Sequence, residues 1–245
     1  MLIHFPIALF IIGVVFDFLG QWKGQRVLVA TAYYNLLVAA ISTVPVVVTG
    51  ILAWHWELEG QKLKGILLMH LVMGCISSLL IWVVWFIHMF ALLNLSFADG
   101  VIAFYDAKYT YNFWRPVTAI RDAGITGNPE TLPDSTWLPE VGNTTPDPSY
   151  PGAHAVISSA AASVLSAFFG KEHFDFVVTS EVLPGVERSF KSFSGANKEA
   201  TLSRIFAGVH FRPDLTAGQK LGRRIADFVF DNFLTPIEER DDNDR

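Results

Sequence analysis

The stretch Ser203-Arg204-Ile-Phe-Ala-Gly208-Val-His210-Phe-Arg-Pro-Asp214 decides how the second half of the chain is interpreted. His210 and Asp214 are four residues apart. On a helical backbone the carboxylate would hold one ring nitrogen, and the other nitrogen would be free as a nucleophile or metal ligand. Arg204 lies six residues before His210, so one site requires either a break near Gly208 or the reach of the Arg side chain. Taken alone, the stretch is equally typical of a hydrogen bond on a helix surface.

A second segment, Lys108-Tyr-Thr-Tyr-Asn-Phe-Trp-Arg115-Pro116, adds two permanent cations. Lys108 and Arg115 are seven residues apart, which is two helical turns, so a helix would point both toward the same volume. The ordinary interpretation of such a pair is a solvated helix face. The sequence around it predicts a helix over 99–122, with a kink or an end at Pro116.

A third segment, Tyr150-Pro151-Gly152-Ala153-His154, opens a helix that we expect over 154–169. Backbone amides in a first helical turn, together with the helix dipole, bind anions, and small residues allow a close approach. The alternative is simple punctuation between a loop and a helix. If all three segments form one site, it holds three cations and two imidazoles, as a tetrahedral oxyanion such as phosphate or vanadate requires.

The first half of the chain is apolar enough to cross a membrane. Hydrophobic residues make up 51% of the sequence, and no Asp, Glu, Lys or Arg occurs in 27–56 or 65–98. A helix needs about 20 apolar residues to span the hydrocarbon core. With the shorter segment 2–19, the pattern predicts three membrane helices. The loop charges are balanced and do not orient the chain.

We expect an all-α protein made of three parts. A bundle of three transmembrane helices over 1–97 precedes a helical domain over 98–234 and a charged, disordered tail over 235–245. Further helices are expected over 196–209 and 218–233, a long loop over 124–151, and no strand. The net charge of −5 excludes the basic face of a nucleic-acid-binding protein.

The three segments together resemble the signature of a known superfamily. Lys-x6-Arg-Pro, Pro-x-x-His and Ser-Arg-x5-His-x3-Asp are similar to the motifs of vanadium-dependent haloperoxidases, type 2 phosphatidic acid phosphatases and bacterial acid phosphatases. The resemblance covers about 97–233 and is greatest to haloperoxidase-like bacterial proteins. It implies a helical bundle in which the third-motif histidine, His210, ligates vanadium or attacks phosphorus. It also implies the following roles: equatorial oxygen contacts for Lys108, Arg115 and Arg204, and general acid for His154.

Two departures from this resemblance bear on activity. The family pattern Pro-Ser-Gly-His is Pro151-Gly152-Ala153-His154 here, so a hydroxyl that would contact the oxyanion is missing at Gly152. Loss of one hydrogen bond to a charged group costs about 1.5–3 kcal/mol. In addition, the membrane bundle takes the place of helices that haloperoxidases carry before the first motif. Packing of that bundle on the catalytic half, a second copy in a homo-oligomer, or loss of part of the fold would each account for this.

The membrane half resembles an uncharacterised bacterial four-helix membrane family through Leu2-Ile-His-Phe-Pro-Ile-Ala-Leu9. It contains four histidines, His4, His55, His70 and His88. Imidazoles on different helices can ligate a haem, whereas neutral core or interfacial histidines are the ordinary interpretation.

Three functions follow from these patterns. The first is a membrane-anchored haloperoxidase that binds vanadate through His210 and oxidises halide with peroxide, with His154 moving protons. The second is a phosphomonoesterase, acting on a phosphate ester through a phospho-histidine at His210 oriented by Asp214, without a cofactor. The third is an inactive oxyanion-binding or haem-carrying module. In each case the lipid bilayer is a partner. The resemblance places the chain in a bacterial inner membrane, with the catalytic domain on the extracytoplasmic side.

Overall fold

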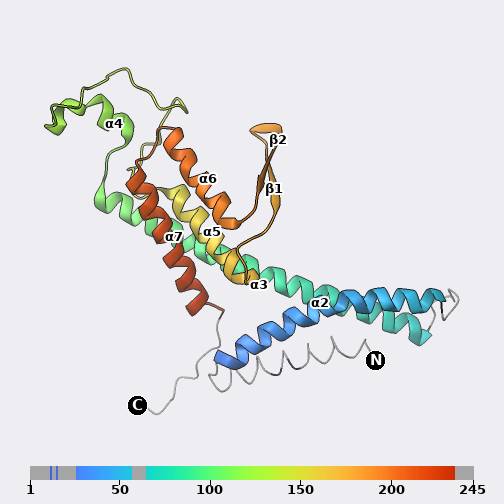
Figure 1. Ribbon diagram of the computed structural model, residues 1–245. Coiled ribbons are helices and arrows are strands. Elements are labelled where there is room, and N and C mark those ends of the chain that lie inside the picture. Colours follow the sequence, from blue (N-terminus) through green and yellow to red (C-terminus); the bar gives the residue numbers. More distant parts are fainter. Residues whose placement is uncertain (1–11, 13–14, 16–25, 57–64, 235–245) are drawn as a thin grey trace, which may run out of the picture. The chain divides into compact units, whose positions relative to one another are not determined.

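The computed structural model describes residues 12, 15, 26–56 and 65–234 (Figure 1). The chain divides into two compact units, and the unit Ala91–Phe233 contains all three motifs. The elements in chain order are α2 (Arg26–Trp56), α3 (Gly65–Tyr111), α4 (Pro116–Arg121), the 3-10 helix η1 (Ala123–Thr126), α5 (Ala153–Phe169), β1 (Phe176–Ser180), β2 (Leu183–Phe190), α6 (Phe193–Phe206) and α7 (Arg212–Asn232).

Two described helices, α2 and α3, are long and apolar enough to cross a membrane. Many of their apolar side chains are exposed, including Leu79 and Ile87, at 64% and 61%. Such surfaces are stable in lipid and costly in water. The third expected membrane helix, over 2–19, and the tail over 235–245 fall almost entirely outside the described residues.

Helix α3 runs without a break from the apolar segment into the second unit. A separate helix over 99–122 is therefore a wrong prediction: the return of charge near Asp99 changes what the helix faces and leaves the backbone helical. In the second unit, one face of α3 is buried at four-residue intervals, a spacing that keeps side chains on one side of a helix. Its members are Leu92, Ser96, Gly100, Phe104 and Lys108.

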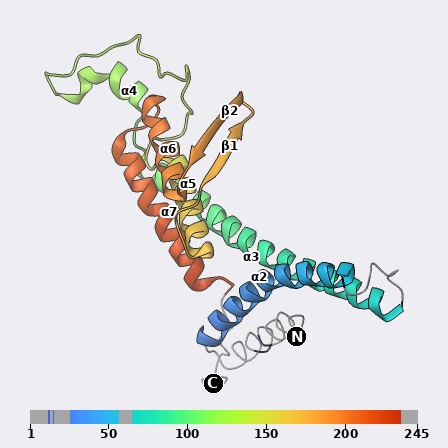
Figure 2. The same ribbon diagram turned by 45° about the vertical axis from the view of Figure 1, so that its right-hand side comes forward.

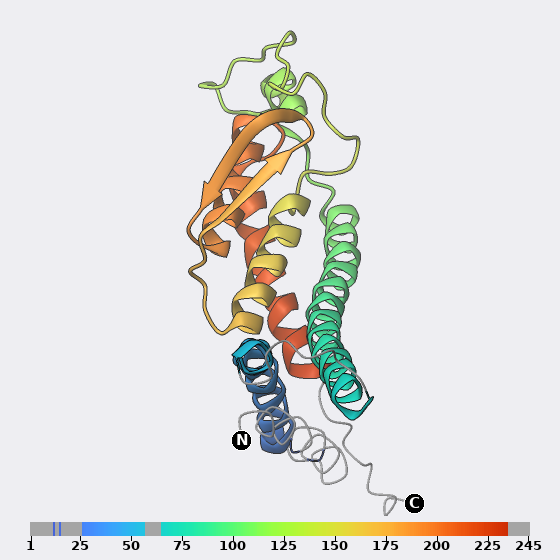
Figure 3. The same ribbon diagram turned by 90° about the vertical axis from the view of Figure 1, so that its right-hand side faces the viewer.

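The core of the second unit is the contact between α5 and α7, with α6 against α5 (Figures 1 and 3). Two glycines of α7 allow the close approach. A Cβ added at Gly222 would lie 2.1 Å from the carbonyl oxygen of Val156, and one at Gly218 would lie 2.6 Å from that of Gly152. Since α7 begins just after His210 and α5 begins just before His154, this crossing sets the distance between the second and third motifs.

The expectation that the chain lacks strands is wrong at one place. Strands β1 and β2 form an antiparallel hairpin that follows α5 and contacts α6 through β2 (Figure 2). The run Phe-Val-Val-Thr-Ser over Phe176–Ser180 is rich in β-branched residues, which favour strands. The rest of the described chain is helix and loop, so the prediction of a predominantly α-helical fold is confirmed.

Candidate active site

Lys108 is the last buried residue of the α3 stripe, and its side chain is 1% exposed. Its ammonium group lies 2.9 Å from Oδ2 of Asp147. It also donates to the carbonyl oxygen of Pro148 and, at 3.4 Å, to that of Ser149. A buried ammonium is stable only when it is paired and hydrogen-bonded, and the long loop before α5 supplies all of these acceptors.

Arg115 reaches the same loop by a different route from the expected one. Helix α3 ends at Tyr111, Asn112 has a φ of 45°, and Arg115 is the extended N-cap of α4. The predicted shared helix face for Lys108 and Arg115 is therefore wrong. The two cations meet instead because both bind Asp147, with Arg115 Nη2 at 3.1 Å from its Oδ1.

The guanidinium group of Arg115 connects the loop to the third motif. Nε donates to the Asp147 carbonyl oxygen at 2.9 Å, and Nη2 donates to Oγ1 of Thr145 at 2.8 Å. Nη1 donates to the Val209 carbonyl oxygen at 2.9 Å and lies 3.1 Å from Nε2 of His210. The first and third motifs are therefore in direct contact.

His210 and Asp214 are paired, although the segment that joins them is only partly helical. His210 precedes α7, and Asp214 lies in the first turn, where its Oδ2 accepts the Phe211 amide at 3.0 Å. The contact between His210 Nδ1 and Asp214 Oδ2 is longer, at 3.4 Å. Ser149 bridges the two side chains, because its hydroxyl donates to Asp214 Oδ2 at 2.5 Å and lies 3.3 Å from His210 Nδ1.

The tautomer of His210 follows from these partners. A guanidinium can only donate, so Nε2 must accept from Arg115. In neutral His210 the proton is then on Nδ1, facing Ser149 and Asp214. Burial lowers the pKa of His210, and the charge of Arg115 acts in the same direction. The ring is therefore neutral at pH 7, with its Nε2 lone pair among cations.

The second motif begins α5, with Gly152 as its N-cap. The Gly152 amide donates to the Asp214 carbonyl oxygen at 3.0 Å, which ties the start of α5 to the start of α7. A Cβ at Gly152 would lie 2.7 Å from Cδ2 of Leu215, so the residue without a side chain fits this contact. The amides of Ala153 and His154 belong to the first helical turn and have no acceptor within the helix.

His154 and Arg204 complete the set of expected residues. Helix α6 ends at Phe206, and Gly208 has a φ of 74°, which is the break that the spacing of Arg204 and His210 required. The His154 side chain is exposed. Desolvation lowers the pKa of His154, and the nearby charge of Arg204 is the next contribution. Nε of Arg204 donates a hydrogen bond to Oγ of Ser203, at 3.1 Å.

The sequence interpretation missed Thr145, Asp147 and Ser149. Burial acts to raise the pKa of Asp147, but hydrogen bonds from Thr145 and Lys108 and the charge of Arg115 lower it to about 2. For Asp214, burial again opposes the contacts with His210 and Ser149, and the pKa lies below its usual range. The sequence predicted a long loop over 124–151, and loops of this length are often functional, but it contains no periodicity that would single out these residues.

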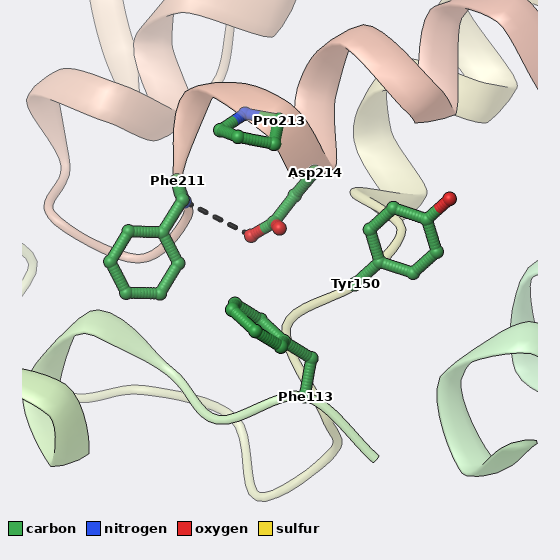
Figure 4. Close-up of a pocket in the computed structure, with 5 residues that line it drawn as sticks. All are labelled: Phe113, Tyr150, Phe211, Pro213 and Asp214. Carbon is green, nitrogen blue, oxygen red and sulfur yellow. Dashed lines mark hydrogen bonds between the residues drawn. The ribbon is translucent and has the colours of Figure 1, made fainter. Parts of the chain in front are cut away.

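A pocket of about 300 Å³ borders this cluster (Figure 4). Its walls are mainly aromatic, and the rings of Phe113 and Phe211 meet edge to face with centroids 5.8 Å apart. The residues around it are Phe113, Tyr150, Phe211, Pro213 and Asp214. Because Asp214 belongs to both, the pocket adjoins the imidazole site.

The fold and the site define a class of protein: an α-helical bundle in which buried cations lie around a neutral histidine. The family model of the VCPO second helical-bundle domain matches residues 88–239, and the chain belongs to that family. A second family model, that of a predicted membrane protein (DUF2231), matches residues 1–104. The chain therefore joins a membrane-protein domain to a haloperoxidase-type helical bundle.

Known relatives share this second part. The crystal structure described as the first bacterial vanadium-dependent iodoperoxidase is 35% identical, with a TM-score of 0.53, and the match covers 62% of this chain and 34% of that one. A vanadium chloroperoxidase from Curvularia inaequalis is 24% identical over 56% of this chain and 29% of its own length. A holo-type bacterial vanadium-dependent chloroperoxidase is 21% identical with a TM-score of 0.46, covering 57% of this chain and 34% of its own. The chain thus spans about a third of the length of the relatives that it matches.

Proposed function

We propose that this protein is a membrane-integral enzyme that binds vanadate at His210 and oxidises halide with peroxide. The observation that carries the proposal is the contact of 3.1 Å between Arg115 Nη1 and His210 Nε2, beside buried Lys108. The iodoperoxidase at 35% identity supports the choice of chemistry. In this assignment residues 1–97 anchor the chain in lipid and residues 98–234 carry the reaction.

His210 has the properties of a metal ligand or of a nucleophile that attacks phosphorus. Its Nδ1–H faces Asp214 and Ser149, which fixes the ring. Burial outweighs the upward effect of the Asp214 contact on the pKa of His210. The lowered pKa keeps Nε2 unprotonated at neutral pH. A histidine held in this way can form a bond at Nε2 as soon as the Arg115 N–H turns to another acceptor.

The surrounding donors fit a tetrahedral oxyanion. Lys108, Arg115 and Arg204 supply three positive charges, and the first-turn amides of Ala153 and His154 add donors at the positive end of the α5 dipole. Bound vanadate supplies a Lewis-acid centre that makes peroxide reactive toward halide. The protein holds that ion, neutralises its charge and moves protons through the exposed imidazole of His154.

Gly152 stands where the family pattern has a serine, and its surroundings fit a residue without a side chain. Leu215 occupies the space that a side chain at this position would need, and the Gly152 amide supports α7. The proposed oxyanion site therefore relies on backbone amides and cations where family members add a hydroxyl. We expect weaker vanadate binding as a result, by the cost of one hydrogen bond to a charged group, about 1.5–3 kcal/mol.

Phosphate-ester hydrolysis is the second candidate. It is favoured by the same fixed Nδ1 of His210, since a nucleophilic imidazole needs an oriented ring. The lipid-compatible helices α2 and α3 would bring a membrane phosphate ester to the enzyme. In this reaction His154 would protonate the leaving group.

One set of assays separates the two candidates. The detergent-solubilised protein, incubated with vanadate, is tested for iodide and bromide oxidation by hydrogen peroxide. The vanadate-free protein is tested for release of phosphate from phosphatidic acid and from a soluble aryl phosphate. The variant His210→Ala is compared with His173→Ala, which removes an exposed histidine outside the site.

Vanadate-dependent halide oxidation that is lost in His210→Ala and kept in His173→Ala is the expected result. Ester hydrolysis with the same dependence on His210, without halide oxidation, would replace the first candidate by the second. The absence of both activities, or activity that survives in His210→Ala, would refute the proposed site.

A further inference from the structure

The donors of Lys108 and Arg115 are fully engaged by the protein itself. An ammonium has three N–H donors and a guanidinium five. Around Lys108 the structure places three acceptors, two backbone carbonyls and Asp147 Oδ2. Around Arg115 it places five, which are two backbone carbonyls, Thr145 Oγ1, Asp147 Oδ1 and His210 Nε2. An incoming anion can therefore reach these cations only by taking the place of an acceptor.

The acceptors differ in how easily they can be replaced. The carbonyl oxygens of Pro148, Ser149 and Val209 are fixed in the backbone, and leaving such a group buried and unpaired is costly. The Asp147 side chain is 21% exposed, compared with 1% for that of Lys108. Rotation about its side-chain bonds moves the carboxylate into water, where it is well solvated. The backbone oxygen of Asp147 stays on Arg115 Nε during this rotation, so the loop keeps its position.

We propose that Asp147 is an internal anion that occupies the oxyanion position on Lys108 and Arg115, and that vanadate or phosphate binds by displacing its carboxylate. This inference rests on the proposed function, because it names the residue that controls oxyanion affinity at the same site. The displaced carboxylate frees one donor of Lys108 and one of Arg115. The oxyanion also replaces the contact between Arg115 Nη1 and His210 Nε2, which provides a third donor for it.

The charge of Asp147 sets the selectivity of this exchange. After its displacement the carboxylate is still attached to the loop beside the two cations, so it repels the bound anion. The repulsion is greater for a dianion than for a monoanion. The site therefore discriminates against doubly charged oxyanions such as hydrogen phosphate at neutral pH. Because the pKa of Asp147 is about 2, this discrimination persists throughout the physiological pH range.

The test is isothermal titration of the full-length, detergent-solubilised protein with orthovanadate and with inorganic phosphate. Asp147→Asn keeps the shape of the side chain and removes its charge. Asp134→Asn is the matched control, since it makes the same change of charge in the same loop, where the exposed Asp134 carboxylate accepts from the amide and hydroxyl of Thr136. Asp147→Ser is a second neutral variant in case Asp147→Asn does not fold, and Asp147→Glu keeps the charge.

We expect both neutral variants to bind vanadate about tenfold more tightly than wild type, with a larger gain for phosphate, and Asp134→Asn to bind like wild type. Vanadate binding that depends on His210 in the wild type, but is not tightened in either neutral variant, would overturn the role of Asp147 and leave the proposed function standing. Tightening in Asp147→Glu equal to that in Asp147→Asn would overturn it as well. If neither the wild type nor the neutral variants bind vanadate, both the inference and the proposed function fail.

Discussion

Replacement of Arg115 by Lys tests whether the guanidinium holds the loop and the third motif together. Arg115 Nη1 bonds the Val209 carbonyl oxygen and contacts His210, while the rest of its fork bonds Thr145 and Asp147. A lysine ammonium has three donors and no fork. It can remain on Asp147, but it cannot reach Val209 and His210 at the same time.

The size of the effect follows from the contacts that are lost. A hydrogen bond to a charged group contributes about 1.5–3 kcal/mol, and a buried carbonyl left unpaired costs about 1–3 kcal/mol. Because these contributions overlap at Val209, we expect Arg115→Lys to lower the free energy of unfolding by about 2–4 kcal/mol. For a chain of 150–250 residues this corresponds to a Tm lower by roughly 4–16 °C.

The measurement is thermal unfolding in detergent, followed by circular dichroism, with Arg121→Lys as the matched control. Arg121 lies on α4, and its Nε donates a hydrogen bond to the Trp137 carbonyl oxygen at 2.9 Å. We expect its replacement to cost less than about 1 kcal/mol. Equal Tm values for the two lysine variants would show that the Arg115 fork does not join the motifs, and the reasoning would be refuted.

Three further changes test other contacts. Gly222→Ala places a Cβ 2.1 Å from a backbone oxygen of α5. Overpacking should lower the free energy of unfolding by about 1–3 kcal/mol, which is more than alanine adds in helix propensity. The control Gly124→Ala, whose added Cβ has its nearest atom at 4.0 Å, should leave Tm unchanged. A stable Gly222→Ala would contradict the close crossing of α5 and α7. Ser149→Ala should cost about 1.5–3 kcal/mol at pH 7 by removing a hydroxyl from a buried carboxylate, and a smaller change in urea unfolding would mean that this contact is not formed. Because folding lowers the pKa of His210 below 6.5, the unfolded chain binds a proton at higher pH than the folded chain, and stability should fall as the pH decreases below 6.5. His210→Gln should lose part of this pH dependence. An identical pH profile in the variant would show that the folded protein does not contain a buried neutral ring at this position.

Several residues that the sequence singled out are in contact in the structure, but the backbone that positions them was not predicted. The four-residue spacing of His210 and Asp214 indicated a pair only if the backbone were helical, whereas the structure pairs them across the start of α7, where Asp214 accepts the Phe211 amide. For Lys108 and Arg115, helical periodicity predicted that the two cations lie close together, but they do so through Asp147 and not on one helix face. A periodic pattern identifies residues on one side of an element, but it does not reveal where that element ends.

Contacts made by loops could not be predicted in this way. Asp147 and Ser149 are central because of where the chain runs between η1 and α5, and no local spacing in 124–151 indicates that path. The hairpin is a different case, since the β-branched run of β1 is visible in the sequence, whereas Pro184 and Gly185 interrupt the pattern of β2. The uninterrupted helix α3 was missed because a change of composition at Asp99 resembles a domain boundary.

Binding of vanadate tests the central claim, that the three motifs form one oxyanion site around His210, most directly. Isothermal titration compares detergent-solubilised wild-type protein with His210→Ala and with the control His173→Ala. We predict one vanadate site in the wild type and in His173→Ala, and no binding in His210→Ala. Binding of equal strength in His210→Ala, or no binding to the wild type at millimolar vanadate, would contradict the claim.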